Sequence, residues 1–445
     1  MIHIIFLIII SLIVVLSIYA AVQSAFEKEK RAARIFSFLG SISLGITVLG
    51  FAEMIPLFAE SAFVMLSAGV SLLLFFPWAG TKHITTSTPA GRIDERLTMF
   101  SRAKLEKGSK HYSAFYTDYP EFELTDDQWR KNPGLGSKGS RFYSPLYTAA
   151  AEASFLTIGK NRAFRTFHAE KDPHFSDTKT TGTYIHRWLK LLGAHDSGIC
   201  NIHPYHRYSK KGYGEEYGKE PQEAHQYAVA FIVPMDKHMV DTAPHPPTMT
   251  ESAHQYANSG IIAIQLAAYI SRLGYDATAH IDGAYDMVLP LVAADAGLGT
   301  IGRMGVLMHP LFGPRCRIAV VSTNMPLPLT QKYTDKSLLD FCRLCKKCAV
   351  VCPSASIPKG DRETIDNTFR WKINQEACYT YWTVAGTDCA RCMSVCPYSH
   401  ENNLIHRFIR FGIRHNKIFR YLAVKLDDVF YGKKPGSKSC HHFEH

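Results

Sequence analysis

Three long apolar runs fill the first part of the chain and restrict what it can fold into. Ile2–Phe26 contains no Asp, Glu, Lys or Arg, residues 35–58 contain one acid, Glu53, and residues 62–80 contain none. Each run can cross a hydrocarbon core of about 30 Å, for which a helix needs roughly 20 residues. A cleaved signal peptide would account for the first run but not for three in succession. The sequence therefore predicts a membrane anchor of three transmembrane helices over residues 1–80.

Basic residues are unevenly distributed among the segments that connect these runs. The connection near Ala59 and Glu60 carries no base, whereas bases fill the connection between the first two runs and the segment after the third: Lys28, Lys30, Arg31, Arg34, Lys82, Arg92, Arg96, Arg102, Lys104, Lys107 and Lys110. The positive-inside rule places both basic segments in the cytoplasm. We expect a multi-pass protein of the inner (cell) membrane with its soluble part on the cytoplasmic side. Glu53 falls within the predicted second helix, either as a proton or quinol contact or as a carboxylate snorkelling to the interface.

The remaining chain shows three further changes of pattern. Residues 81–150 are polar and rich in Gly, Pro and Tyr, which predicts linker and irregular structure. Over residues 151–335, the strand-like runs YAVAFIVPMD and RIAVVSTN alternate with the helix-like SGIIAIQLAAYISRLGY and MVLPLVAADAGLG, which predicts an α/β domain. Residues 401–445 form a basic tail. Its amphipathic helix either packs over the cysteine-rich unit or lies on an anionic membrane face.

Two cysteine runs near the C-terminus have the spacing of iron–sulfur ligands. FCRLCKKCAVVCP begins at Phe341 and CYTYWTVAGTDCARCMSVCP begins at Cys378. C-x2-C-x2-C-x3-C-P is the bacterial ferredoxin pattern, in which the last cysteine of each run reaches the other [4Fe–4S] cluster. A zinc site needs only four ligands and leaves the C-x3-C-P endings unexplained. We predict a ferredoxin-like unit over residues 336–400, with Cys342, Cys345, Cys348 and Cys396 on one cluster and Cys352, Cys378, Cys389 and Cys392 on the other.

A glycine motif precedes the cysteines. Gly297, Gly299 and Gly302 spell G-x-G-x-x-G, but a dinucleotide fingerprint needs a strand before it and an acid about 20 residues later. The preceding segment has a helical pattern, and residues 303–329 contain no Asp or Glu. The glycines therefore favour close approach of the backbone to another large planar ligand. The formal charge of +11 comes without a basic block interleaved with aromatic residues, so we expect no nucleic-acid partner.

The two cysteine runs follow the segment AGLGTIGRMGVLMHPLFGPRCRIAVVSTNMPL. In this order, the three segments resemble the corrinoid-dependent reductive dehalogenases, and the resemblance extends over about residues 140–400. The related epoxyqueuosine reductases share the glycine segment and the clusters. The resemblance implies a nitroreductase-like α/β core that holds a cobalamin-type corrinoid, base-off, against the ferredoxin-like unit. It assigns corrinoid binding to Gly297, Gly299, Gly302, Arg303 and Asp282. The three fused helices and the missing twin-arginine pair depart from the pattern of the family, whose members are usually exported.

The resemblance also implies a reaction: reductive removal of halogen from a small organohalide by a Co(I) corrinoid, which the two clusters supply with electrons. The donor would be the quinol pool or a ferredoxin-type protein, and membrane lipid would be the other partner. The proton donor of the family is a Tyr paired with a base. Tyr256 is the best match, with Tyr285 in reserve, and Arg315 or Arg317, then Arg303, is the candidate cation.

Two alternatives stay open. An epoxyqueuosine-reductase-like corrinoid reductase shares the motifs, but the membrane anchor and the lack of a helical-repeat tail for tRNA weaken this interpretation. A non-catalytic, membrane-bound ferredoxin subunit would also need the clusters. It would leave the predicted α/β domain at residues 151–335 without a task.

Overall fold

The computed structural model describes residues 1–445 except 83, 171, 174–176, 223–224, 333 and 440–445. The chain forms two compact units. The anchor unit comprises residues 1–84, 336–345 and 401–435, and the core unit comprises residues 85–335, 346–400 and 436–445. The two units are described separately below.

Three apolar helices begin the anchor unit: α1 (Ile2–Phe26), α2 (Lys30–Phe51) and α3 (Leu57–Phe75). All three are long and apolar enough to cross a membrane, as predicted, and α1 packs against both α2 and α3. Glu53 does not lie within the second helix, so that prediction is wrong. It follows the end of α2 in the left-handed region, at φ 54°, in the turn to α3. The buried acid of this region is Glu60, in the first turn of α3, whose carboxylate lies 2.7 Å from His3 Nδ1.

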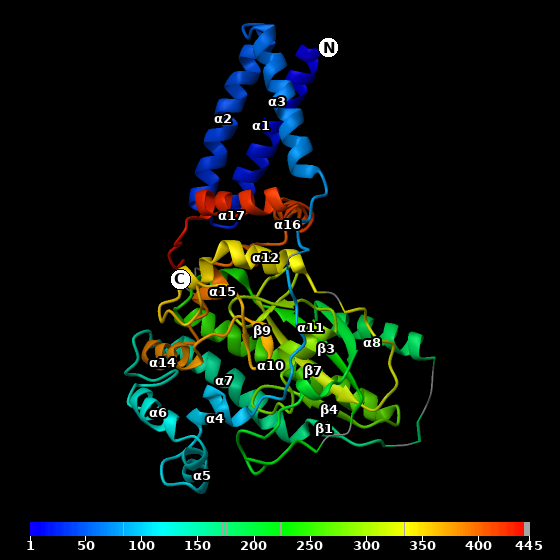
Figure 1. The fold of residues 1–445 in the computed structure, drawn as a ribbon, viewed down its shortest axis with the longest axis vertical. Helices are drawn as coiled ribbons and strands as arrows, with labels where there is room; N and C mark the ends of the chain where they lie inside the picture. The colour runs from blue at the N-terminus through cyan, green and yellow to red at the C-terminus, as the bar shows by residue number, and fades with distance from the viewer. Residues whose placement is uncertain (83, 171, 174–176, 223–224, 333, 440–445) are drawn as a thin grey trace. The chain divides into compact units, whose positions relative to one another are not determined.

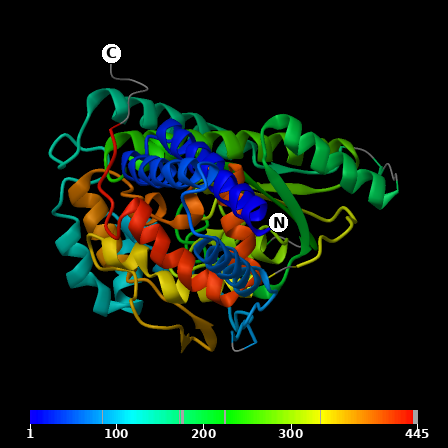
Figure 2. The same ribbon diagram turned by 90° about the horizontal axis from the view of Figure 1, so that it is seen from above.

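Three more helices complete the anchor unit: α12 (Lys336–Cys345), α16 (Leu404–His415) and α17 (Lys417–Tyr431). Figure 1 shows α16 and α17, in orange and red, lying across the lower end of the three blue helices, and Figure 2 shows the same blue, orange and red helices from above. Both contact α12 and α3, and α17 also contacts α2. The buried Arg420 of α17 donates to Asp340 Oδ2 of α12 at 2.7 Å and to the carbonyl of Ala79 at 2.9 Å. The C-terminal tail therefore packs on the helix that carries the first two predicted cluster ligands.

A five-stranded sheet forms the centre of the core unit, in the order β1 (Thr166–Phe167), β4 (Ala277–His280), β7 (Cys316–Thr323), β3 (Tyr227–Pro234) and β2 (Asp196–Asn201). Its two longest strands, β3 and β7, coincide with the two strand-like runs in the sequence. Every pairing in this sheet is antiparallel, whereas alternating helices and strands are typical of parallel sheets. The predicted alternation of elements is present, but the strands reverse direction at each step across the sheet.

Helices cover both faces of this sheet because successive side chains of a strand point to opposite sides. Val229, Phe231 and Val233 of β3 enter a core formed with α7 (Pro145–Asn161), α8 (Thr178–Leu192) and α10 (Pro246–Arg272). Ala228, Ala230 and Ile232 enter a second core formed with α11 (Leu289–Asp295). The short pair β5 (Thr300–Ile301) and β6 (Leu307–Met308) follows α11.

Residues 85–150 are more ordered than the sequence predicts. They contain α4 (Met99–Ala103), α5 (Lys110–Asp118) and α6 (Glu123–Trp129) around the buried aromatic side chains Tyr112, Phe115 and Tyr116. Buried Arg102 donates from Nε to Asp126 Oδ2 at 2.9 Å. The aromatic residues recur every three or four positions, which is helical spacing, but the many polar residues between them conceal it.

The cysteine-rich part of the core unit is built from short elements: α13 (Lys347–Val351), the pair β8 (Glu363–Ile365) and β9 (Thr368–Arg370), α14 (Gln375–Ala385) and α15 (Arg391–Ser394). The remaining helix, α9 (Lys237–Asp241), follows β3 and contacts α15 and α10. The sheet and the cysteine-rich segment thus belong to one unit, and the candidate site is built from both.

Candidate functional site

One of the two predicted ligand sets lies wholly in the core unit: Cys352 after α13, Cys378 on α14, and Cys389 and Cys392 at α15. Burial raises the pKa of Cys378 to about 11 and that of Cys389 to about 12, and the nearby Cys352 adds to both shifts. Burial, then Cys348 and after it Cys389, Cys378 and Cys352, raises the pKa of Cys392 well above its usual value. The four thiols are therefore electrostatic neighbours, and Cys348 of the other predicted set also lies near Cys392, so the division of the ligands between two clusters stays a prediction from the spacing.

The surroundings of Cys352 suit a metal-bound thiolate. Burial alone would raise the pKa of its thiol, but hydrogen bonds from Ser354, Ser356 and the backbone of Ile357 outweigh burial and lower it. Hydrogen bonds to ligand sulfur are a regular feature of iron–sulfur proteins. The other predicted set takes Cys342 and Cys345 from the anchor unit and Cys348 and Cys396 from the core unit, and stays a prediction from the spacing.

Tyr256 and Arg317 form the most distinctive contact of the core unit. The guanidinium carbon of Arg317, on β7, lies 4.6 Å from the ring centroid of Tyr256, on α10. Ser252 precedes Tyr256 by one helical turn, so both side chains face Arg317, and Arg317 Nη2 donates to the Ser252 hydroxyl. The same nitrogen lies 3.4 Å from Oδ2 of Asp388, the residue before Cys389. The proton-donor candidate is thus paired with one of the three candidate cations.

The charges around this pair fix its protonation. Arg317 is the strongest influence on the pKa of Tyr256 and lowers it, but burial together with Asp282 and Asp388 outweighs Arg317, so the net pKa lies above the usual value. Burial lowers the pKa of Arg317, but Tyr256 and Asp388 more than compensate for this. At neutral pH the pair is therefore a protonated phenol, able to donate, beside a permanent cation.

Asp282 and Tyr285 extend this polar cluster. Burial raises the pKa of Asp282, against the opposing effects of Arg162, Lys104 and Arg317, and Arg162 Nη2 lies 3.2 Å from Asp282 Oδ2. Burial, then Asp282 and Tyr256, raises the pKa of Tyr285 well above its usual value. Protein surrounds Tyr256, Tyr285 and Arg317 closely, yet each keeps some accessible surface.

Arg315 and Arg303 have other tasks in the fold. Buried Arg315 donates to the carbonyls of Ser399, at 3.2 Å, and Met235. Buried Arg303 donates to the carbonyls of Pro358, at 2.7 Å, and Gly360, at 2.6 Å, and lies over the Trp371 ring. Each joins loops of the core unit through backbone carbonyls. Within the described contacts, Arg317 is the candidate cation that lies against Tyr256.

The motif glycines allow close packing of the backbone in the segment around β5 and β6. A Cβ on Gly299 would lie 2.4 Å from the carbonyl oxygen of Met308, and one on Gly297, at φ 84°, would lie 2.8 Å from that of Gln331. The amide of Gly302 donates to the carbonyl of Val306. These contacts explain the first two glycines by the packing of the protein itself, and their role towards a corrinoid stays a prediction.

Sequence reasoning missed Asp388, Ser252, Tyr208 and Tyr213, of which the two tyrosines are electrostatic neighbours of Tyr285. A usable signal existed for Asp388 because it is an acid directly before a predicted ligand, in TDCARC. Ser252 was detectable as the residue one turn before Tyr256. The two tyrosines offered no local pattern, since they lie in a segment without periodicity.

The chain is also similar to known proteins. Residues 341–400 match the 4Fe-4S dicluster domain family. The tetrachloroethene reductive dehalogenase of Sulfurospirillum multivorans is 33% identical over 222 residues, 48% of this chain and 44% of that protein. A tetrachloroethene reductive dehalogenase of Desulfitobacterium hafniense is 32% identical over 213 residues, 45% of this chain and 38% of that protein. The matches thus span less than half of the length of these relatives.

Solved structures show the same fold. The catabolic reductive dehalogenase NpRdhA, in complex with 3-bromo-4-hydroxybenzoic acid, superimposes with a TM-score of 0.62 at 22% identity, over 81% of this chain and 50% of that one. A reductive dehalogenase structure described as suggesting a mechanism for B12-dependent dehalogenation gives 0.60 over 80% of this chain and 50% of that one, also at 22% identity. The chain is therefore a relative of the reductive dehalogenases, with their fold and with a 4Fe-4S dicluster domain at residues 341–400.

Proposed function

We propose that this protein is a membrane-anchored reductive dehalogenase, which converts a small organohalide, two electrons and one proton into the hydrogenated product and a halide ion. The observation that carries the proposal is the Tyr256–Arg317 pair, within one unit with Cys352, Cys378, Cys389 and Cys392. The similarity to tetrachloroethene reductive dehalogenases supports it. A ferredoxin subunit without catalytic activity has no use for a partly buried phenol beside a cation.

A corrinoid suits the polar cluster around Arg317. Arg317 Nε and Asp388 Oδ1 are buried and have no hydrogen-bond partner among the described residues. Leaving buried polar atoms unpaired is costly, so a donor and an acceptor left open side by side favour a ligand rich in amide groups, such as a corrinoid. Asp282, Tyr285 and Arg317 would hold it, together with the backbone at Gly297, Gly299 and Gly302 as predicted from the sequence. When bound, a corrinoid supplies the cobalt chemistry that cleaves a carbon–halogen bond.

The side chains of the site have separate tasks in this reaction. Tyr256 stays protonated at neutral pH and donates its proton to the carbon that loses the halogen. Arg317 stabilises the tyrosinate that remains, because it keeps its charge 4.6 Å from the ring. Ser252 and Asp388 fix the guanidinium in place. The enclosed position of the pair limits access of water, so the proton comes from a defined donor.

Electrons enter through the two predicted [4Fe–4S] clusters, either from the quinol pool or from a ferredoxin-type donor. The three apolar helices support anchoring in the inner membrane, and the basic residues at the start of α2 support a cytoplasmic position for the core unit.

Anaerobic production, cluster and corrinoid reconstitution, and metal analysis test the proposal on the full chain. We expect about eight irons and one cobalt per chain, and halide release from tetrachloroethene or 3-bromo-4-hydroxybenzoate with reduced methyl viologen as donor. The matched control, Tyr256→Phe, should keep both metals and lose halide release. Iron without cobalt would overturn the corrinoid assignment.

Full metal content without halide release from either compound would overturn the dehalogenase assignment. It would favour a corrinoid reductase of the epoxyqueuosine type instead. An epoxyqueuosine reductase of Synechococcus is 25% identical over 123 residues, 25% of this chain, so epoxyqueuosine-modified RNA is the substrate to try next.

A further inference from the structure

The last two helices of the anchor unit expose apolar side chains at helical spacing. Leu404, Phe408 and Phe411 of α16 are 66%, 51% and 55% exposed, and intervals of four and three residues place them on one face. On α17, Leu422, Leu426 and Val429 repeat the same intervals and are also exposed. The buried side of α17 carries Arg420 instead. An exposed apolar stripe on each of two neighbouring helices is unfavourable in water and marks an interaction surface.

Contacts within the anchor unit place this surface at the end of a spanning helix. Asn416 joins α16 to α17, and its side-chain amide donates to the carbonyls of Leu73, at 2.9 Å, and Phe76, at 2.8 Å, at the end of α3. The ring centroid of Phe75 lies 5.5 Å from that of Phe408. The apolar face of α16 therefore continues the membrane-facing surface of α3.

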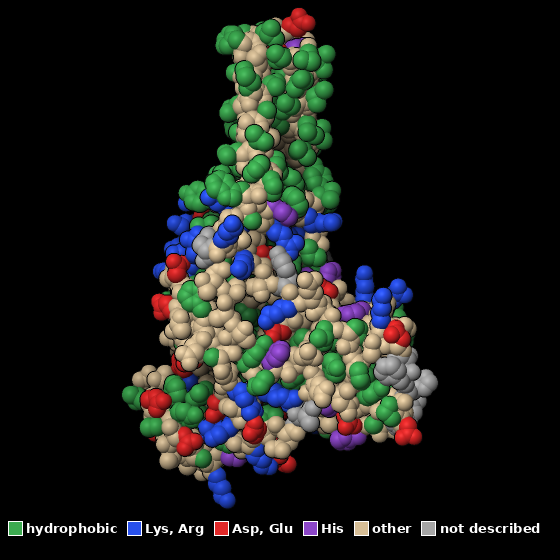
Figure 3. All heavy atoms as spheres, turned by 45° about the vertical axis from the view of Figure 1, so that its right-hand side comes forward, with side chains coloured by type: hydrophobic (Ala, Val, Ile, Leu, Met, Phe, Trp, Pro, Cys, Tyr) green, Lys and Arg blue, Asp and Glu red, His purple; other side chains and the backbone are tan. Residues whose placement is uncertain are grey.

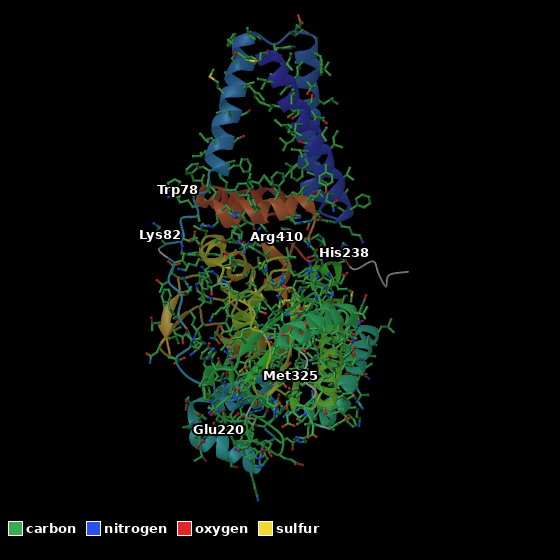
Figure 4. All side chains as sticks on the ribbon, turned by 90° about the vertical axis from the view of Figure 1, so that its right-hand side faces the viewer. Trp78, Lys82, Glu220, His238, Met325 and Arg410 are labelled. Carbon is green, nitrogen blue, oxygen red and sulfur yellow. The ribbon has the colours of Figure 1, made fainter. Side chains whose placement is uncertain are left out.

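The beginning of α2 contacts α17. Phe36, at the beginning of the apolar part of α2, stacks on Phe430 of α17 with ring centroids 4.4 Å apart. The start of α2 and the end of α3 lie on the same side of the membrane. The contacts of Asn416 with α3 and of Phe430 with α2 therefore place α16 and α17 at one membrane–water interface. The Lys417 ammonium lies 3.4 Å from the Trp78 ring centroid, and Figure 4 shows Trp78 at the level of α16 and α17. Trp is enriched at this depth in membrane proteins.

Basic residues surround the apolar stripes. Arg407 on α16 and Lys425 on α17 are exposed. The turn before α2 and the first turns of α2 add four exposed bases: Lys28, Lys30, Arg31 and Arg34. Figure 3 shows Lys and Arg side chains gathered at the base of the apolar bundle. Acids are also present on these helices, but Glu27 is buried and bonded to Asn403, and Asp427 and Asp428 are engaged in contacts of their own.

We propose that α16 and α17 form an interfacial platform that lies in the headgroup layer of the same membrane and binds anionic phospholipids. The apolar stripes enter the boundary between headgroups and acyl chains, while Arg407, Lys425 and the bases at the start of α2 contact the lipid phosphates. Because Arg420 ties α17 to Asp340 of α12, the platform also fixes the helix that carries Cys342 and Cys345. An anionic surface would thus set the depth of two cluster ligands.

Lipid analysis and hydrogen exchange test this on the full chain in nanodiscs. Wild type should enrich phosphatidylglycerol over phosphatidylcholine in its bound lipid, and Arg407→Gln with Lys425→Gln should lower this enrichment by about tenfold. The matched control, Lys107→Gln with Lys219→Gln, removes two exposed bases of the core unit and should leave it unchanged. Equal enrichment in wild type and the α16–α17 variant would overturn the role of these charges.

Hydrogen exchange of the unmodified chain gives an independent readout. Amides over residues 404–431 should exchange more slowly in nanodiscs containing phosphatidylglycerol than in phosphatidylcholine alone, and the difference should shrink in high salt. Identical exchange in both lipids would overturn the proposal, whatever the behaviour of the variants. Inorganic phosphate should not displace the lipid, because a free anion lacks the acyl chains that cover the apolar stripes.

Discussion

Replacing Arg317 with Gln removes the cation over the Tyr256 ring and leaves the phenol in place. The charge lies 4.6 Å from the ring centroid. At an effective dielectric constant of about 20, a unit charge at that distance stabilises a tyrosinate by about 3.6 kcal/mol. This corresponds to about 2.6 pKa units, so proton donation by Tyr256 becomes harder by a factor on the order of 10² to 10³. We expect Arg317→Gln to lower kcat by a factor on the order of 10² to 10³ with little change in KM, because the effect arises only as the proton leaves.

The assay is anaerobic halide release with reduced methyl viologen, normalised to iron and cobalt content. Arg317→Lys should recover part of the lost rate, because it restores the charge without the planar guanidinium that Ser252 and Asp388 hold. Tyr256→Phe sets the floor for loss of the proton donor. The reasoning is refuted if Arg317→Gln stays within threefold of wild type while Tyr256→Phe is inactive, or if Tyr256→Phe itself keeps full activity.

Other consequences of the structure can be measured separately. Cys392→Ala should lower the iron content from about eight to about four per chain, because it removes a ligand of one predicted cluster, and unchanged iron would contradict the ligand assignment. Gly299→Ala places a Cβ 2.4 Å from the Met308 oxygen and should cost about 1–3 kcal/mol of stability, whereas Gly360→Ala, with no atom within 4 Å of its Cβ, should be neutral in the same thermal melt. Burial alone would raise the pKa of Asp286, but His280, Lys211 and Arg165 outweigh burial and hold it well below the usual value. Its ionised form therefore stabilises the fold above about pH 4, and this contribution is lost as the pH falls further. Asp286→Asn should lower the Tm at pH 7 by several degrees, and the Tm of the variant should fall less steeply in acid than that of wild type. A parallel decline of the Tm in both proteins would argue against the ion pairs.

Local patterns carried most of the correct predictions. The apolar runs predicted α1, α2 and α3, and the buried runs around Phe231 and Val320 predicted β3 and β7, because hydrophobic spacing survives in a single sequence. The cysteine spacing predicted the dicluster domain for the same reason. The antiparallel order of the sheet was not predictable, since pairing depends on how the connections cross. Glu53 was misplaced because a helix end is decided by the turn that follows it, here at a positive φ.

The sequence predicted the candidate residues of the site but not which of them pair. Tyr256 and three arginines were candidates, but choosing Arg317 required knowing that β7 brings its side chain under α10. Asp388 completes the contact from the cysteine-rich segment, far along the chain. Contacts between distant segments arise from packing, and no local pattern records them. The helices α4, α5 and α6 were missed because they are short, at five, nine and seven residues, so none spans enough turns to show a helical repeat.

The contact between Arg317 and Asp388 links the proposed proton donor to the segment that carries predicted cluster ligands. Asp388 is joined by one peptide bond to Cys389, so the position of its carboxylate follows that of this predicted ligand. If the proposed cluster forms there, a change in its ligation would move the acid that holds the guanidinium against Tyr256, and the reactivity of the phenol would depend on the state of the cluster site.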